Sequence, residues 1–318
     1  FLFEVERCGS EKTTIRAVAF AERDVYVKHL YYSSVFYYFC TKIQKRILRQ
    51  MLVFPNAKIN IGLNVVEKRS DGYHNIETVF YPVCGLYDAL EAVAADEVSL
   101  TVSGFGISGN DADNLVVKAY RLLNNDFGLP PLAFYLKKTI PMGAGLGGGS
   151  ADASFTLKAL NTMFDLRLSD ERLERYALQL GADCPFFVGN CPAFAQGKGE
   201  CLTPIGLDLR GKYLLLAKPA VSVGTGDAYG GVVVRRSEVD LRQAVLQPLN
   251  TWRDTITNAF EKNIFARYPI LSSIKDEMYS LGAVYAAMSG SGSTIYGIFD
   301  HAPQGTVSGS CFCKVILL

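Results

Sequence analysis

The chain lacks the features that mark membrane proteins, nucleic-acid-binding proteins and disulfide-rich proteins. None of its apolar runs is long enough to cross a bilayer. Its charge is balanced, with 32 basic and 31 acidic residues, and no basic stripe that would attract nucleic acid. Its eight cysteines are scattered along 318 residues, so we expect reduced thiols in a cytosolic protein. The length of 318 residues suits one large domain or two ordinary ones, and the hydrophobic content of 49% is typical of a globular protein.

Two common nucleotide-binding patterns are also missing. The stretch "PMGAGLGGGSADAS", residues 141–154, does contain G-x-G-x-x-G at Gly143, Gly145 and Gly148. A dinucleotide-binding fold needs a second strand after the following helix, and "SDERLERYALQLG" predicts another helix instead. No lysine follows the glycines as a triphosphate loop requires, and the protein-kinase motifs are absent.

The glycines themselves still indicate a phosphate site. Five of them fall within the seven residues 143–149, far more than a tight turn needs. Successive glycines allow consecutive backbone N–H groups to point at one anion, and a helix predicted to begin at Ser150 adds its dipole. A second glycine turn, "MSGSGST" at 288–294, could close over the same site, although alone it is equally consistent with a hairpin.

Alternation of apolar and polar residues predicts a strand over residues 52–66. Its polar face carries Lys58 and Asn60. "DNLVVKAYRLLNNDFG" predicts a helix that Asp113 caps and Gly128 ends.

Ser169 is expected to cap the second helix after the glycine loop. Two further helices are predicted over 241–256 and 258–282, the second broken around Pro269, and "CFC" near the C-terminus is expected on an edge strand.

The first fifty residues have no clean period and are rich in aromatic and basic residues. We therefore expect 1–50 to be an extension outside the fold. The remainder divides into predicted domains at 51–205 and 206–318, because helices begin to replace short strands near residue 205.

Phosphoryl transfer needs a group that takes or orients the acceptor proton, and a cation for developing charge. Asp183, in "GADCPFF", and Lys58 are the candidates. By spacing alone, Lys58 is better interpreted as a solvated strand lysine, and Asp183 is consistent with a turn aspartate. Nothing in the spacing brings the two residues together.

Five segments, in this order, resemble the GHMP small-molecule kinases: "NAKINIGLNVVEKRSDGYHNIETVF", "PMGAGLGGGSADAS", "GADCPFF", "AFAQGKGE" and "MSGSGST". The resemblance covers about 51–318. It implies an α+β fold with a ribosomal-S5-like N-terminal domain, which binds ATP, and a ferredoxin-like C-terminal domain. "DGYH" combined with "AKIN" and "GAD-x-P-F" resembles the branch that phosphorylates the 2-hydroxyl of a cytidine diphosphate methylerythritol in the non-mevalonate isoprenoid pathway.

The resemblance implies roles for individual residues. Lys58 and Asp183 match the catalytic pair, and Asn60 and Thr225 match positions near the methylerythritol and its phosphate. The cytosine pocket would comprise Tyr73, His74 and Tyr229. The implied ATP-binding residues are Asn114, Lys138, Pro141, Met142, Gly143, Ala144, Gly145, Leu146, Gly147, Gly148, Gly149 and Ser150.

The cofactors implied are ATP and Mg²⁺, and the setting is the bacterial cytoplasm, with a monomer or weak homodimer. Two departures from the family pattern affect these assignments. "TGDAY" at 225–229 stands where relatives often have a proline-containing run, and Asp152 stands where they often have Asn or a small residue. We therefore assign no metal ligand from the sequence.

Two alternatives remain. One is a GHMP kinase with another acceptor, such as mevalonate or a sugar, which an assay with both acceptors would separate. The other is a catalytically silent kinase-like sensor. Loss of Lys58 or Asp183 would favour the sensor, and both residues are present.

Overall fold

The structure is a computed structural model that describes residues 4–6, 14–16, 50–105, 113–234 and 238–318. The chain divides into two compact units, 1–48 and 49–318. Within the first unit, β1 (Glu4–Glu6) and β2 (Thr14–Arg16) pair as antiparallel strands. The second unit carries the predicted site.

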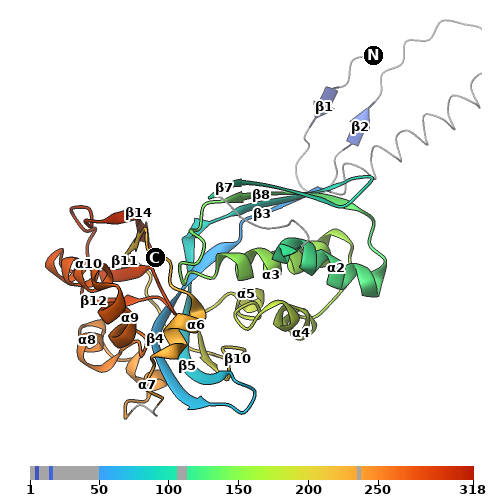
Figure 1. Ribbon diagram of the computed structural model, residues 1–318. Helices are drawn as coiled ribbons and strands as arrows, with labels where there is room; N and C mark the ends of the chain where they lie inside the picture. The colour runs from blue at the N-terminus through green and yellow to red at the C-terminus, as the bar shows by residue number, and fades with distance from the viewer. Residues whose placement is uncertain (1–3, 7–13, 17–49, 106–112, 235–237) are drawn as a thin grey trace, which may run out of the picture. The chain divides into compact units, whose positions relative to one another are not determined.

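The strands described in the second unit form three four-stranded sheets (Figure 1). One sheet has the order β3-β6-β8-β7 and contains one parallel pair, β7 with β8. The second has the order β10-β9-β5-β4, and the third β12-β13-β11-β14, and both are antiparallel throughout. The strands are β3 (Gln50–Val53), β4 (Asn56–Lys68), β5 (His74–Tyr87), β6 (Ala89–Ala94), β7 (Ser99–Gly104), β8 (Leu132–Lys138), β9 (Ala193–Gln196), β10 (Cys201–Pro204), β11 (Tyr213–Pro219), β12 (Tyr285–Met288), β13 (Ile295–Phe299) and β14 (Ser310–Leu317).

Helices pack against the first and third sheets. The first sheet shares a hydrophobic core with α2, α3 and α4, and the third with α9 and α10. The α+β class predicted from the sequence is confirmed. The helices are α2 (Leu115–Phe127), α3 (Gly148–Met163), α4 (Asp170–Leu180), α5 (Phe186–Gly189), α6 (Thr225–Gly230), α7 (Leu241–Ala244), η2 (Leu249–Thr251), α8 (Trp252–Thr255), α9 (Glu261–Arg267) and α10 (Pro269–Ser280).

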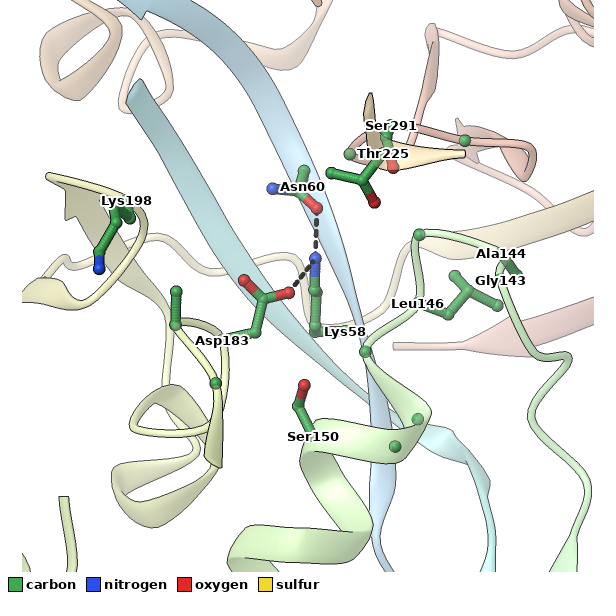
Figure 2. Close-up of a pocket in the computed structure, with 18 of the residues that line it drawn as sticks. Lys58, Asn60, Gly143, Ala144, Leu146, Ser150, Asp183, Lys198, Thr225 and Ser291 are labelled. Atoms are coloured by element: carbon green, nitrogen blue, oxygen red, sulfur yellow. Dashed lines mark hydrogen bonds and ion pairs between the residues drawn. The ribbon is translucent and has the colours of Figure 1, made fainter. Parts of the chain in front are cut away.

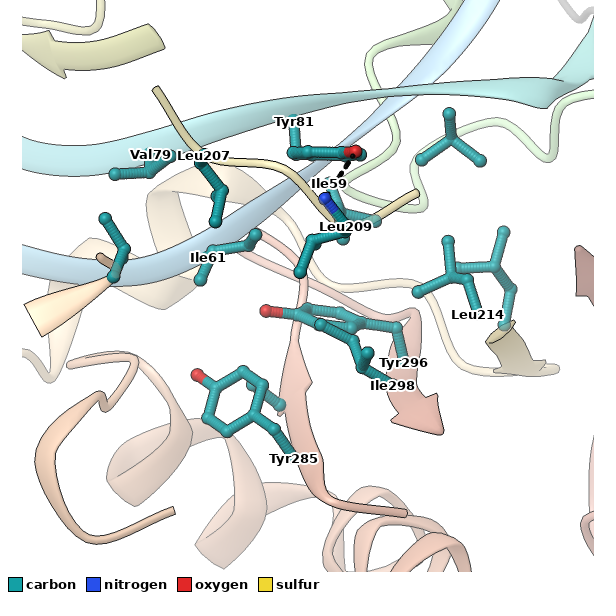
Figure 3. Close-up of a cluster of buried hydrophobic side chains, with 14 of the residues drawn as sticks. Ile59, Ile61, Val79, Tyr81, Leu207, Leu209, Leu214, Tyr285, Tyr296 and Ile298 are labelled. Atoms are coloured by element: carbon teal, nitrogen blue, oxygen red, sulfur yellow. Dashed lines mark hydrogen bonds between the residues drawn. The ribbon is translucent and has the colours of Figure 1, made fainter. Parts of the chain in front are cut away.

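A shared core joins the second and third sheets (Figure 3). Ile59 and Ile61 of β4 enter this core together with Tyr285 and Tyr296 of the third sheet. The strand predicted over 52–66 is divided at Phe54 and Pro55 into β3 and β4, which belong to different sheets. The predicted alternation is confirmed within β4, but its polar face is buried as well, and Lys58 is only 3% exposed. The interpretation of Lys58 as a solvated strand lysine is therefore wrong.

Several helix ends differ from the sequence predictions. Asn114, not Asp113, caps α2, and its side chain accepts a hydrogen bond from the backbone N–H of Val116. The helix after the glycine loop begins at Gly148, two residues before Ser150. Ser169 occupies the N-cap position of α4, but its side chain makes no capping hydrogen bond to the helix.

The helix predicted over 241–256 is divided into α7, η2 and α8. Pro248 lies between the first two and has no N–H to continue a helical hydrogen-bond pattern. The break at Pro269 is confirmed, because this proline is the first residue of α10.

Cys311 and Cys313 lie on β14, which is an edge strand as predicted. In the described part of the chain, none of the helices has the length and apolar character that a membrane span requires.

Candidate active site

All the residues that the sequence and the family resemblance selected line one cavity of about 1300 Å³. The cavity lies between the glycine loop, the buried polar face of β4, the turn before β5 and the start of α6. Spacing in the sequence could not bring these segments together. The selected residues are Lys58, Asn60, Tyr73, His74, Asn114, Lys138, 141–150, Asp183, Thr225 and Tyr229.

Lys58 and Asp183 form an ion pair at the centre of the cavity (Figure 2). The Lys58 Nζ lies 3.3 Å from Asp183 Oδ2 and donates a hydrogen bond of 2.5 Å to Asn60 Oδ1. The ammonium is almost completely buried, whereas 37% of the Asp183 side chain is exposed. A fixed cation thus holds a carboxylate that faces the open space, an arrangement suited to taking a proton from a bound hydroxyl.

The glycine loop surrounds the end of α3 that faces this pair. Gly143, Gly145 and Gly147 all have positive φ angles, a backbone conformation that residues other than glycine rarely adopt. A Cβ at Gly147 would lie 2.9 Å from the Phe187 ring and 3.0 Å from Lys58 Cγ. The loop must therefore be glycine-rich to pass this close to the lysine, and α3, at 16 residues, directs its N-terminal dipole at the cavity.

The second glycine turn does close over the same cavity. Gly290, Ser291 and Gly292 are part of its lining, and Figure 2 shows Ser291 on the side of the open space opposite Ser150 of α3. The backbone N–H of Thr294 donates to the Ala144 carbonyl at 3.2 Å. The turn is thus joined to the glycine loop as well as being a hairpin between β12 and β13.

A second group of charged residues also lies beside the glycine loop. Lys138 forms ion pairs with Asp88 and with Asp152 at 2.6 Å, and all three side chains are buried. Asp88 Oδ1 also accepts the backbone N–H groups of Thr139, at 2.6 Å, and Ile140, at 2.9 Å. The group therefore fixes the backbone that leads into the glycine loop.

Asp152 has an unusual environment within this group. Its Oδ1 atom is buried and has no hydrogen-bond partner among the described residues. Burial raises the pKa of this carboxyl to about 7, against the opposing effect of the Lys138 ammonium. Sequence reasoning noticed Asp152 as a departure from the family pattern, but it gave no sign of Asp88, 50 residues from Lys138.

The residues implied for cytosine recognition lie at the mouth of the cavity. The rings of His74 and Tyr229 stack, with centroids 4.7 Å apart and planes inclined by 17°. Burial, and to a smaller extent the Asp183 carboxylate, raises the pKa of Tyr229. Tyr73 is 60% exposed, and the Lys198 ammonium lies 4.7 Å from the centre of its ring.

Lys198 lies within "AFAQGKGE", but no pattern in the sequence indicates a role for it. It lines the cavity, and Figure 2 shows it across the open space from Thr225. The next residue, Gly199, lies beside Asp183, because a Cβ at Gly199 would be 3.6 Å from Asp183 Oδ1. Lys198 is therefore on the side of the cavity that Asp183 faces.

Two family models match the chain: "GHMP kinases N terminal domain" over residues 114–197 and "GHMP kinases C terminal" over 237–310. A relative from Bacteroides thetaiotaomicron is 51% identical over 261 residues, which cover 81% of this chain and 94% of that protein. The chain belongs to the GHMP kinases.

This relative is named 4-diphosphocytidyl-2-C-methyl-D-erythritol kinase. A Bacteroides fragilis protein with the same name is 53% identical over 254 residues, 79% of this chain and 92% of that protein. Among solved structures, a 4-(cytidine 5'-diphospho)-2C-methyl-D-erythritol kinase has a TM-score of 0.68 and 31% identity, covering 78% of this chain and 90% of its own. The two-domain GHMP kinase architecture expected from the sequence is confirmed, and the roles of individual residues stay predictions.

Proposed function

We propose that this GHMP kinase transfers the γ-phosphoryl group of ATP to the 2-hydroxyl of 4-diphosphocytidyl-2-C-methyl-D-erythritol. The observation that carries the proposal is the Lys58–Asp183 pair at 3.3 Å, in one cavity with the glycine loop and with aromatic rings at the mouth. The names of the relatives support this choice of acceptor.

In the proposed reaction, the 2-hydroxyl oxygen forms a bond to the γ-phosphorus while the bond from that phosphorus to the bridging oxygen breaks. The hydroxyl proton passes to Asp183, and ADP leaves. Lys58 keeps Asp183 ionised and offsets charge on the group in transfer, while the N–H groups of residues 143–150 bind the phosphates. Such catalysis consists of positioning and electrostatic stabilisation.

Mg²⁺ is usually held by substrate phosphates and one or two protein oxygens. The Ser150 hydroxyl at the start of α3 lines the cavity beside the loop and would supply one such oxygen, so the site fits this ion. When bound, the ion would neutralise charge on the phosphates. Asn114 and Lys138, on the same wall as the loop, would lie near the adenosine.

The acceptor is tested directly by a phosphorylation assay with ATP and three acceptors: the cytidine substrate, its uridine analogue and mevalonate. Transfer to the cytidine substrate is expected to be fastest by far. Preference for mevalonate would overturn the proposal, and binding of ATP without transfer to any acceptor would identify a sensor instead.

Tyr73 and His74 test the cytosine pocket. Stacking on an aromatic ring is worth about 1–3 kcal/mol per base, so Tyr73→Ala should weaken binding of the cytidine substrate by that amount and leave ATP binding intact. His74→Ala should narrow the preference for cytidine over uridine. Without the imidazole, binding of the wrong base no longer leaves a hydrogen-bonding group unpaired. Equal weakening of ATP and substrate by Tyr73→Ala would place this turn in the fold and not in the pocket.

The proposal assigns the activity to residues 51–318. This is supported by the division of the chain into units 1–48 and 49–318. A protein that starts at Met51 should keep full turnover in the same assay. Loss of most of the turnover would make the preceding segment part of the working enzyme.

A further inference from the structure

β4 carries Lys58 and Asn60, and within the described residues its outer edge is hydrogen-bonded to loops and not to another strand. β4 is the last strand of its sheet, so the N–H group of every second residue points away from β5 and needs a partner outside the sheet. The N–H of Lys58 donates to the Leu146 carbonyl at 2.9 Å, and that of Leu63 to the Thr257 carbonyl at 2.9 Å. Between them, the N–H of Asn60 donates to the Ser289 hydroxyl at 3.2 Å.

Ser289 has a second bond, to the glycine loop. Its hydroxyl donates to the Gly145 carbonyl at 2.8 Å and is completely buried. A serine hydroxyl has one hydrogen to donate, so this bond and the bond from Asn60 use its donor and one acceptor position. One side chain from the C-terminal half thus joins the catalytic strand to the phosphate-binding loop.

The turn around Ser289 is itself held in place. The Asn258 side-chain amide donates to the carbonyls of Met288 and Gly290, on either side of Ser289, at 2.8 Å each. A Cβ at Gly145 would lie 2.0 Å from the Ser289 carbonyl oxygen, so the two loops are in backbone contact. The hydroxyl therefore has little freedom to choose other partners.

We infer that Ser289 is a positioning residue, which fixes the distance between the glycine loop and the Lys58–Asn60 segment through its two hydrogen bonds. It touches neither substrate nor phosphate, because it lies outside the cavity lining. Its effect reaches the reaction through Asn60, whose side chain accepts from Lys58, and through Gly145 of the loop. The inference depends on the proposed function only because the assay uses the proposed acceptor.

The test compares Ser289→Ala with Ser293→Ala, a second completely buried serine of the same turn whose hydroxyl donates to the Val221 carbonyl instead. Ser289→Ala should lower kcat by about 10- to 100-fold, the scale expected for a small misplacement of reacting groups. The affinity for ATP, measured by titration, should fall by about 10-fold, and the KM for the cytidine substrate should change by less than about 3-fold. Ser293→Ala should lower the melting temperature about as much as Ser289→Ala does. It should change kcat, the ATP affinity and the KM by less than about 3-fold each.

A double variant separates positioning from general destabilisation. In an Asp183→Asn background, there is no base left to align, so Ser289→Ala should reduce the remaining turnover by no more than about 3-fold. A reduction as large as in the wild-type background would overturn the inference. So would a kcat of Ser289→Ala no lower than that of Ser293→Ala.

Should Ser289→Ala fail to fold, Ser289→Cys takes its place, because a thiol is a weaker donor with longer bonds. The same comparison with Ser293→Ala then decides. If the wild-type protein transfers nothing to the cytidine substrate, the proposed function fails, and the inference about Ser289 is decided by ATP affinity alone.

Discussion

The cavity has two lysine–aspartate groups, and they differ mainly in their access to water. At its centre, Lys58 is buried, but its partner Asp183 is 37% exposed. Beside the glycine loop, Lys138, Asp88 and Asp152 are all at most 4% exposed. A carboxylate that must exchange a proton with substrate needs an open side, whereas one that fixes a backbone is sealed with its partners. Burial therefore distinguishes a reacting pair from a supporting one, although the residue types are the same.

The largest expected effect is on stability, from breaking the sealed group. Asp88→Ala leaves the Lys138 ammonium with one partner fewer and the N–H groups of Thr139 and Ile140 without their acceptor. Removing one member of a buried ion pair costs about 3–5 kcal/mol, so the free energy of unfolding at pH 7 should fall by that amount. Denaturant unfolding measures it, with the exposed Asp96→Ala as a control that should change it by less than about 0.5 kcal/mol. If Asp88→Ala and Asp96→Ala lowered the free energy of unfolding equally, the buried group would have no special role in stability.

The second effect is on turnover, from the open pair. Asp183→Asn is nearly isosteric but cannot accept a proton, so kcat should fall by roughly 100-fold or more. ATP affinity and melting temperature should change little, because the side chain is partly solvated. A variant with near-wild-type turnover would remove Asp183 from the mechanism, and a large loss of melting temperature would make it a structural residue like Asp88.

The third effect is a pH dependence of stability that comes from the sealed group. The pKa of Asp152 is raised from 3.8 to about 7 by burial, so the folded protein keeps a proton that the unfolded chain releases. The stability from this proton is complete below about pH 4 and is lost as the pH rises to 7. The slope is at most ~1.4 kcal/mol per pH unit.

Asp152→Asn cannot titrate, so its free energy of unfolding relative to wild type should rise between pH 5 and pH 7.5. Denaturant unfolding at several pH values tests this, with Asp96→Asn as the control. A relative stability that is flat with pH would mean that Asp152 is ionised in the folded protein and that Lys138 alone compensates its burial.

The sequence by itself determined the local structure and the kinds of residue at the site. The alternation in β4 predicted which side chains share a face with Lys58, and the glycine-rich run predicted a phosphate-binding turn before a helix. Gly128 and Pro269 marked the end of α2 and the start of α10. These features depend on the backbone preferences of nearby residues, and the resemblance to a family added which positions to watch.

Only the tertiary structure decided which of those residues meet and how far water reaches them. Lys58 and Asp183 are brought to 3.3 Å by the packing of β4 against the loop before α5, and Asp88 reaches Lys138 from the connection between β5 and β6, 50 residues away. The hydroxyl of Ser289 contacts Asn60 from 229 residues further along the chain. Burial and long-range pairing depend on how whole sheets pack, and no short pattern in a sequence contains that information.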